Sequence, residues 1–170
     1  MADPVTDPVA EHDARYGEEG AGPPEWARVR DRMARAGVAW FTTTRPEGGP
    51  HITPLVFVWH EGTPWMCTGP EEQKARNLAA DPRCALLTGT NELHQGIDVV
   101  VEGTAVRETD NATLEAVAGA FLAKYGEEWH FRVDGDVFIH GPGQAHVFRI
   151  DPTVAYSFGK DPYTHTRWRF

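Results

Sequence analysis

Strand-like segments that follow one another with only short turns between them dominate the first half of this chain. Residues 38–44, 51–59 and 63–68 are rich in β-branched and aromatic side chains, and polar turn sequences at 45–50 and 61–62 separate them. Strands connected this closely pair antiparallel, since a parallel connection needs a long crossover. No regular alternation of strands and helices is present. The pattern therefore predicts an antiparallel meander and argues against a doubly wound parallel sheet.

Helical spacing marks three other parts of the chain. Trp26, Val29 and Met33 recur at helical intervals, and Asp110 and Gly126 are suited to begin and end a long amphipathic helix. The sequence predicts a mainly β domain, an antiparallel barrel with helices at its ends. The expected helices cover 23–37, 70–80 and 110–126, and further strands are expected at 83–90, 97–107, 137–140, 146–150 and 154–158.

Charge and hydropathy limit the partners of this chain. It has 25 acidic and 16 basic residues, a formal charge of −9, and so lacks the excess of Lys and Arg that binds nucleic acid or anionic membranes. No apolar run reaches the length of a transmembrane helix, and the N-terminus lacks the order of a signal peptide. We expect a cytoplasmic protein without nucleic-acid or membrane partners. Residues 1–22 are acidic and poor in large apolar side chains, which predicts a disordered tail before one domain at 23–170.

Motifs for the commonest enzyme chemistries are absent from the sequence. It has no P-loop, no glycine-rich dinucleotide fingerprint and no nucleophile elbow. Its histidines do not pair at i, i+4 on a helix and no Cys-x-x-Cys occurs, so no metal site is predicted. We interpret Cys67 and Cys84 as buried thiols, with a disulfide or redox pair as the alternative. An enzyme built this way would take its chemistry from a bound cofactor.

An ordered series of segments resembles one known family. The series is Thr42–Arg45, His51–Trp59, Thr63–Gly69, Lys74–Leu78 and Asp81–Leu86, closed by Thr166–Phe170. Over residues 25–170 the chain resembles the pyridoxamine 5′-phosphate oxidase-like flavin-binding split β-barrels, in particular the actinobacterial flavin and deazaflavin (F420) oxidoreductases. The resemblance implies a six-stranded antiparallel Greek-key split barrel that forms a homodimer. It also implies two cofactor sites at the interface, each built from both chains.

The resemblance assigns the phosphate end of the cofactor to the turn after the third strand. Thr68 and Gly69 lie where that strand leads into a helix, so backbone N–H groups are free there, and Lys74 follows one turn later. The matching threonine and lysine of the family bind phosphate. This chain has Gln73 where a second basic residue is common, and Glu71 and Glu72 oppose an anion unless they face solvent. The alternative is an ordinary capped surface helix.

The ring of the cofactor is assigned to the second strand. Ile52, Thr53, Pro54 and Leu55 match the segment that lines the flavin, and Pro54 suggests a bulge or an edge because it donates no ladder hydrogen bond. We expect His51 to serve the phosphate or the cofactor tail, with a solvent-facing strand histidine as the alternative.

The resemblance assigns groups near the C-terminus and on the fifth strand to the partner chain's site. Gln95 is expected there rather than Asp98, because an acid would repel the cofactor phosphate. The oxidase pattern Arg-x-His-x-Arg reads Tyr163-x-His165-x-Arg167 here, and a tyrosine cannot clamp a phosphate dianion as arginine does, so pyridoxal phosphate is not the expected product. Expected to border the pocket are Arg167, Trp168 and Arg169, with packing at the dimer interface as the alternative for Trp168.

The sequence thus leaves three functions open. The first is an oxidoreductase that uses a flavin-type coenzyme, F420 rather than FMN, for direct hydride transfer to or from a small organic substrate. F420 carries an acidic oligoglutamate tail, for which Arg45, Lys74, Arg76 and Arg83 would provide a basic groove. The second is a non-catalytic protein that binds flavin, F420 or haem and other tetrapyrroles. The third is a structural dimer with an empty cleft.

Overall fold

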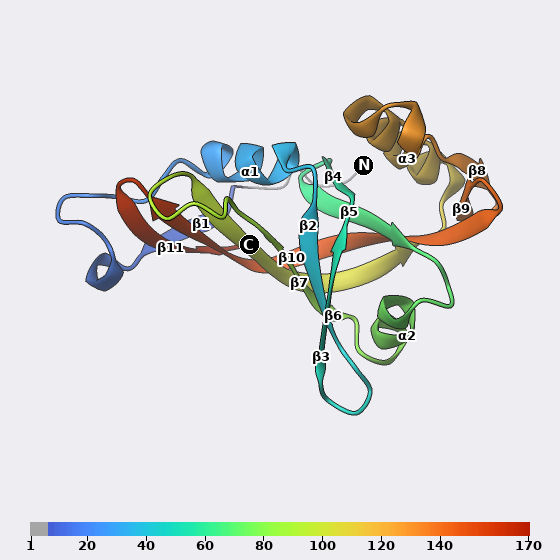
Figure 1. Ribbon diagram of the computed structural model, residues 1–170, viewed down its shortest axis with the longest axis horizontal. Helices are drawn as coiled ribbons and strands as arrows, with labels where there is room; N and C mark the ends of the chain where they lie inside the picture. Colours follow the sequence, from blue (N-terminus) through green and yellow to red (C-terminus); the bar gives the residue numbers. More distant parts are fainter. Residues whose placement is uncertain (1–6) are drawn as a thin grey trace.

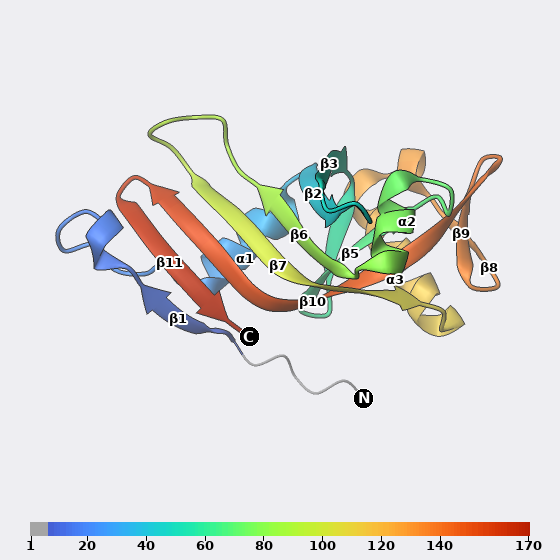
Figure 2. The same cartoon turned by 90° about the horizontal axis from the view of Figure 1, so that it is seen from below.

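One long, bent strand organises the fold. The computed structural model describes residues 7–170, and in it β10 (Gly143–Lys160) pairs along one edge with β7 (Ile97–Glu108). Along its other edge β10 pairs in succession with β9 (Val137–His140), β5 (Thr63–Thr68) and β11 (Tyr163–Arg169). It therefore runs nearly the full length of the molecule and connects its two ends (Figures 1 and 2).

The strands beside β7 and β5 curl into an open barrel. β7 is followed in the sheet by β6 (Arg83–Thr88), β2 (Ala39–Thr44) and β3 (Pro50–Leu55), while β4 (Phe57–His60) pairs with β5. Every strand pair is antiparallel. If β3 and β4 are taken as one bent strand, six strands form the barrel, which is the predicted split-barrel class.

The prediction of one continuous strand at 51–59 is wrong, because the chain turns at Val56 from β3 into β4. Hydrogen bonds from α3 (Asn111–Tyr125) replace ladder bonds at this corner. The Phe57 amide donates to the Tyr125 hydroxyl over 3.1 Å, and the Phe57 carbonyl accepts from Lys124 Nζ over 2.8 Å. A buried backbone break needs such partners, and here the helix provides them.

The prediction of separate strands at 146–150 and 154–158 is also wrong. β10 continues through Pro152, and its register against β7 shifts between Pro152 and Val154. The bulge accommodates the proline, which lacks an amide donor. Gly103 lies opposite, and a Cβ added there would approach the Asp151 carbonyl oxygen to 2.3 Å. A glycine is therefore required at the close approach of the two strands.

Three helices lie on the barrel as the sequence predicts. They are α1 (Trp26–Arg35), α2 (Gln73–Ala80) and α3. Asp110 caps α3 by accepting from the Thr113 amide over 2.9 Å, and Gly126 ends it with a φ of 75°. α1 closes one hydrophobic core with β2, β6, β7 and β10, whereas α3 closes a second core with β4, β5, β9 and the short β8 (Arg132–Asp134). No helix among residues 7–170 is long and apolar enough to cross a bilayer.

The N-terminal segment differs from the expected disordered tail at 1–22. From residue 7 onward the structure describes β1 (Val9–His12), which pairs with β11, and the 3-10 helix η1 (Ala14–Tyr16). Pairing with an existing edge strand supplies the hydrogen bonds that this apolar-poor sequence could not obtain alone. The first part of the expected tail, residues 1–6, lies outside the described residues.

Candidate functional site

A cavity of about 340 Å³ opens between the end of β5, the start of α2 and the β8–β9 hairpin. This volume is within the range of small-molecule sites. Five residues that the sequence assigns to the cofactor line it, namely Pro54, Leu55, Thr68, Gly69 and Lys74. Sequence segments that are far apart along the chain thus meet at one place.

The polar end of the cavity combines a hydroxyl, an amide and an ammonium group. Thr68 is only 3% exposed, and its Oγ1 is a buried atom without a hydrogen-bond partner. The Gly69 amide and the Lys74 ammonium lie beside it, and the Lys74 side chain is 12% exposed. A buried hydroxyl without a partner is costly unless a ligand or water satisfies it. This set of donors fits an anionic group such as a phosphate.

The sequence did not determine whether Glu72 faces solvent or the anion site; in the structure its carboxylate points toward the Gly69 amide and the Lys74 ammonium. Its Oε1 accepts from the Gly69 amide over 2.8 Å, and its Oε2 pairs with Lys74 Nζ. Partial burial alone would raise the pKa of Glu72, but the hydrogen bonds from Lys74 and Gly69 outweigh it and lower the pKa below its ordinary value. The carboxylate is therefore ionised at neutral pH.

A buried amide fixes α2, and with it Lys74, against the barrel. Asn77 is fully buried, and its Nδ2 donates to Thr43 Oγ1 on β2 over 2.9 Å. Gln73 Nε2 in turn donates to Asn77 Oδ1 over 2.8 Å. Gln73, which the sequence noted only as a missing basic residue, thus helps to anchor the first turn of α2.

The opposite wall of the cavity is aromatic and was missed by sequence reasoning. Trp129, Phe131, Phe138 and His140 line it, from the 3-10 helix η2 (Glu127–Trp129) and the β8–β9 hairpin. The rings of Trp129 and His140 stack with centroids 5.8 Å apart and planes inclined by 5°. An available signal was the density of aromatic residues over 129–140, which follows no regular period; of this segment the sequence predicts only the strand at 137–140.

The predicted ring-binding strand presents two faces. Along β3 the exposure alternates, so that His51, Thr53 and Leu55 are half-buried whereas Ile52 and Pro54 are exposed. Thr53 Oγ1 and His51 Nδ1 are buried atoms without hydrogen-bond partners. Burial, followed by the charges of Arg45 and Lys74, lowers the pKa of His51. Of the expected residues, His51, Ile52 and Thr53 do not line the cavity, although His51 lies within the electrostatic reach of Lys74.

The remaining predicted residues lie away from the cavity, on β11 and in the loop before β7; β11 begins at the far end of the molecule and ends near its middle, beside the C-terminus (Figure 1). Arg167 and Arg169 are exposed and pair with Glu11 on β1 at 3.8 and 2.5 Å. Trp168 is 3% exposed in the core, where its Nε1 donates to Ser157 Oγ over 2.9 Å. Gln95 is exposed. Within one chain, none of Gln95, Arg167, Trp168 and Arg169 lines the cavity.

Comparison with known families identifies the family of the chain. The family model described as pyridoxamine 5′-phosphate oxidase matches residues 26–158. The chain belongs to this family. No curated protein matches it.

Solved structures similar to this member of the pyridoxamine 5′-phosphate oxidase family share its fold at low sequence identity. A haem-binding protein from Mycobacterium smegmatis has a TM-score of 0.67 and 21% identity, covering 86% of this chain and 59% of its own. This chain thus spans less than two thirds of that protein. A conserved hypothetical protein from Mycobacterium tuberculosis has a TM-score of 0.68 and 21% identity, with coverage of 88% and 90%. The haem storage protein of Vibrio cholerae has a TM-score of 0.57 and 17% identity, with coverage of 75% and 89%.

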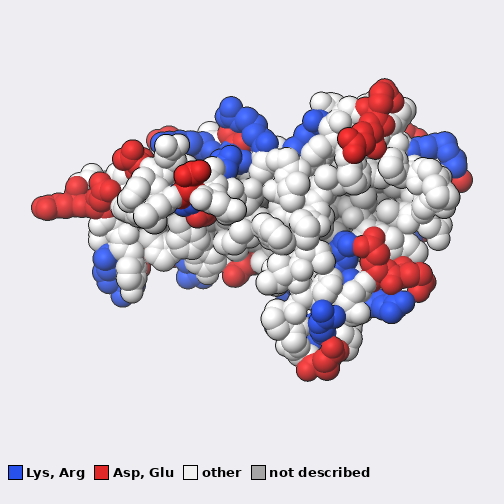
Figure 3. Space-filling model, in the orientation of Figure 1, with Lys and Arg blue, Asp and Glu red and all other residues white. Residues whose placement is uncertain are grey.

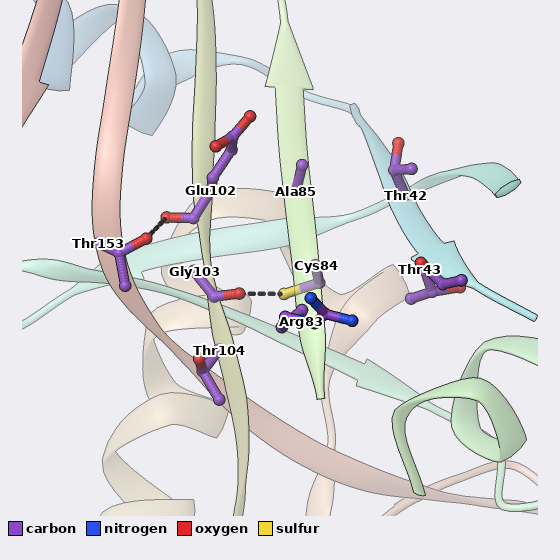
Figure 4. Close-up of a pocket in the computed structure, with 10 residues that line it drawn as sticks. Thr42, Thr43, Arg83, Cys84, Ala85, Glu102, Gly103, Thr104 and Thr153 are labelled. Atoms are coloured by element: carbon purple, nitrogen blue, oxygen red, sulfur yellow. Dashed lines mark hydrogen bonds between the residues drawn. The ribbon is translucent and has the colours of Figure 1, made fainter. Parts of the chain in front are cut away.

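A second hollow, of about 490 Å³, lies on the outer face of β2, β6 and β7 (Figure 4). Thr42, Thr43, Cys84, Glu102 and Thr153 are among its lining residues. Burial raises the pKa of the Cys84 thiol to about 12, so it remains protonated at neutral pH and is a poor nucleophile. Burial has the same effect on the Cys67 thiol in the first cavity, whose pKa is also about 12. Both cysteines are free, so no disulfide joins them.

Three of the four cations expected to form a basic groove for an acidic cofactor tail are already paired in this chain, and Arg45 is the exception among residues 7–170. Lys74 pairs with Glu72, Arg76 with Glu71 at 3.2 Å, and Arg83 with Asp81 at 2.6 Å. Basic and acidic side chains accordingly lie side by side over α2 (Figure 3). Among residues 7–170, no group of three or more His, Cys, Asp and Glu side chains could hold a metal ion.

Proposed function

We propose that this member of the pyridoxamine 5′-phosphate oxidase family is an oxidoreductase that binds a flavin-type coenzyme in the cavity at the start of α2. The observation that carries the proposal is the pairing of an anion-binding end, Thr68, Gly69 and Lys74, with a flat aromatic wall in a cavity of about 340 Å³. A phosphorylated tricyclic ring requires both features. The residues of this chain would bind and orient the ring and exclude water, and the coenzyme would supply the hydride chemistry with a small organic substrate.

The identity of the coenzyme is the finer part of the proposal. Resemblance to the deazaflavin branch favours F420 over FMN. The ion pairs over α2 favour the shorter FMN, because an oligoglutamate tail would have to displace Glu71 from Arg76 and Asp81 from Arg83. We retain F420 as the first candidate and FMN as the second. Free cysteines at positions 67 and 84 fit a reducing compartment, and we therefore place the protein in the cytoplasm.

We further propose that two copies of the chain form a homodimer through the outer face of β2, β3 and β6. Trp40, Ile52 and Leu87 are 51%, 56% and 39% exposed there, and Trp40 lies directly opposite Leu87 in the register. Apolar side chains gathered on a sheet face mark an interaction surface. A second copy would also bring the β11 end of one protomer toward the cavity of the other, as the resemblance implies. Replacement of Trp40 by Glu should convert the dimer to a monomer in analytical ultracentrifugation, and a wild-type monomer would contradict this part.

One observation favours a second function, the binding of a tetrapyrrole without turnover. His140 lines the cavity, and its Nε2 bonds to the Glu128 carbonyl oxygen at 2.9 Å, which leaves Nδ1 for another partner. Two of the similar structures described above are a haem-binding protein and a haem storage protein. A haem ligated by His140 would use the same aromatic wall.

A set of titrations decides between these functions. The purified chain is titrated with FMN, F420 and haem, followed by absorption and by quenching of tryptophan fluorescence. Binding of FMN or F420 together with turnover of an electron acceptor supports the oxidoreductase. A Soret band that shifts in wild type but not in His140→Ala supports the tetrapyrrole binder. If none of the three ligands binds, both proposed functions are wrong.

A further inference from the structure

The donors assigned to the coenzyme phosphate already hold an anion from the same chain. The Glu72 carboxylate accepts from the Gly69 amide over 2.8 Å and pairs with the Lys74 ammonium. It thereby engages two of the three groups at the polar end of the cavity. Thr68 Oγ1, the third group, is 3% exposed and forms no hydrogen bond of normal geometry, although it lies close enough to Glu72 to help lower the pKa of that carboxyl.

We infer that Glu72 is an internal competitor for the anion subsite, which must leave Gly69 and Lys74 before the phosphate of a ligand can bind. Glu72 would then determine how strongly this cavity discriminates between phosphorylated and unphosphorylated forms of one ring. The inference rests on the proposed function for the identity of the ring, but not for the presence of the anion subsite.

The surroundings of Glu72 permit such an exchange. Its side chain is 51% exposed, so solvent lies on one side and a rotation can carry the carboxylate out of the cavity. Lys74, by contrast, is 12% exposed and has no carboxylate other than Glu72 as an ion-pair partner among the described residues. A departing Glu72 therefore leaves a nearly buried ammonium group, which strongly favours the entry of another anion.

The neighbouring glutamate shows that this arrangement is specific to position 72. Glu71 is 89% exposed and pairs with Arg76, away from the cavity lining. Both glutamates precede α2 and carry the same charge, so general repulsion of a phosphate by the helix start would involve both. Direct competition involves Glu72 alone. Glu71 is therefore a matched control.

The variant that tests the inference is Glu72→Gln, which keeps the size of the side chain and removes its charge. Its affinities for FMN and for riboflavin, which has the same ring without phosphate, are measured against wild type and Glu71→Gln. FMN should bind Glu72→Gln more tightly by about tenfold or more, since a charge-assisted contact is worth that much. Riboflavin affinity should stay the same, and Glu71→Gln should resemble wild type with both ligands.

A second measurement does not depend on flavin binding. The amide resonance of Gly69 is followed by NMR while inorganic phosphate is added to wild type and to each variant. Saturation at a lower phosphate concentration in Glu72→Gln, but not in Glu71→Gln, supports competition by Glu72. If that result is obtained and no flavin binds, the proposed function fails but the inference about Glu72 is upheld. Equal phosphate affinities in all three proteins, or an equal gain for FMN and riboflavin, would overturn the inference.

Discussion

The two ends of the molecule present opposite kinds of surface. At the α2–α3 end, backbone and side-chain donors converge with aromatic rings on a cavity that holds Lys74. At the β11 end, Arg167 and Arg169 project outward and share the carboxylate of Glu11. The first region can bind a ring and its anionic group in one cavity, whereas the two arginines of the second are exposed cations that do not line that cavity. The family resemblance places both sets in one site, but within a single chain neither arginine lines the cavity, and β11 ends near the middle of the molecule, where the C-terminus lies (Figures 1 and 2).

The β11 end also has a cleft of its own, but of a different composition. About 520 Å³ in volume, it is lined by Tyr16, Leu93, Phe158, Tyr163 and His165 among others. Two of its charged groups pair with each other, Lys160 with Asp98 at 2.9 Å. Tyr16, Tyr163 and His165 fall outside the segment 26–158 that matches the family. Leu93 and Phe158 lie within that segment, as do all the residues that line the cavity at the start of α2.

The largest expected effect is a loss of stability, and it distinguishes Trp168, which is buried in the core, from Trp129, which lines the cavity. Trp168→Ala removes a side chain that is 3% exposed and packs on Trp26 with centroids 5.2 Å apart. We expect the free energy of unfolding to fall by about 3–5 kcal/mol in urea titrations. Trp129→Ala, at the half-buried cavity wall, should cost less stability but weaken coenzyme binding. If Trp168→Ala left stability unchanged and lowered coenzyme affinity, Trp168 would belong to the site rather than to the core.

An intermediate effect tests which cation serves the coenzyme. Lys74→Ala should weaken the binding of FMN or F420 by about 1.5–3 kcal/mol, because it removes a charge-assisted contact from a nearly buried position. Arg167→Ala should have a smaller effect, and only in the dimer, because its guanidinium is 51% exposed and lies outside the cavity of its own chain. Isothermal titration of both variants measures the difference. A larger loss of coenzyme affinity in Arg167→Ala than in Lys74→Ala would mean that Arg167, and not Lys74, is the main cation of the coenzyme site.

The sequence predicted those parts of the fold that depend on local patterns. The caps of α3 and the strands at 63–68 and 97–107 follow from residue type and spacing within a few positions. The break at Val56 and the continuity of β10 through Pro152 could not be predicted, because they depend on Tyr125 and Gly103, which are distant in sequence. Local patterns specify elements, whereas the partners that bend or extend them come from the tertiary fold.

The candidate site divides in the same way. Thr68, Gly69 and Lys74 were predicted because the family resemblance assigns the phosphate to this turn and because a strand-to-helix turn exposes backbone amides. The aromatic wall of Trp129 and His140 has no such local rule, since it forms only when the β8–β9 hairpin folds over β5. The direction of Glu72 was equally undetermined, because a glutamate just before a helix can face solvent or turn back to cap a preceding amide.

The smallest expected effect concerns Lys124, a half-buried cation at the cavity end that has no carboxylate partner among residues 7–170, whereas Lys160 at the β11 end is paired with Asp98. Lys124 on α3 donates to the Phe57 carbonyl and lies 4.2 Å from the Phe57 ring centroid, and burial lowers its pKa to about 8. An unfolded lysine titrates near its ordinary pKa, so between about pH 8 and pH 10 the unfolded chain binds more protons than the folded one. Stability contributed by this group should therefore rise with pH across that interval.

Two thiols act in the opposite direction and determine how the measurement must be made. Burial raises the pKa of Cys67 and of Cys84 to about 12, so above about pH 9 their unfolded forms lose protons first and stability falls. Because Lys124→Met retains both cysteines, the difference in unfolding free energy between wild type and this variant isolates the lysine. The unfolding free energy of wild type relative to Lys124→Met should increase as the pH rises from about 8 to 10. The exposed control Arg28→Met should show no such trend, because a guanidinium stays protonated throughout this interval. A flat difference for Lys124→Met would mean that the ammonium is solvated in solution and that the α3–β4 corner is looser than the structure shows.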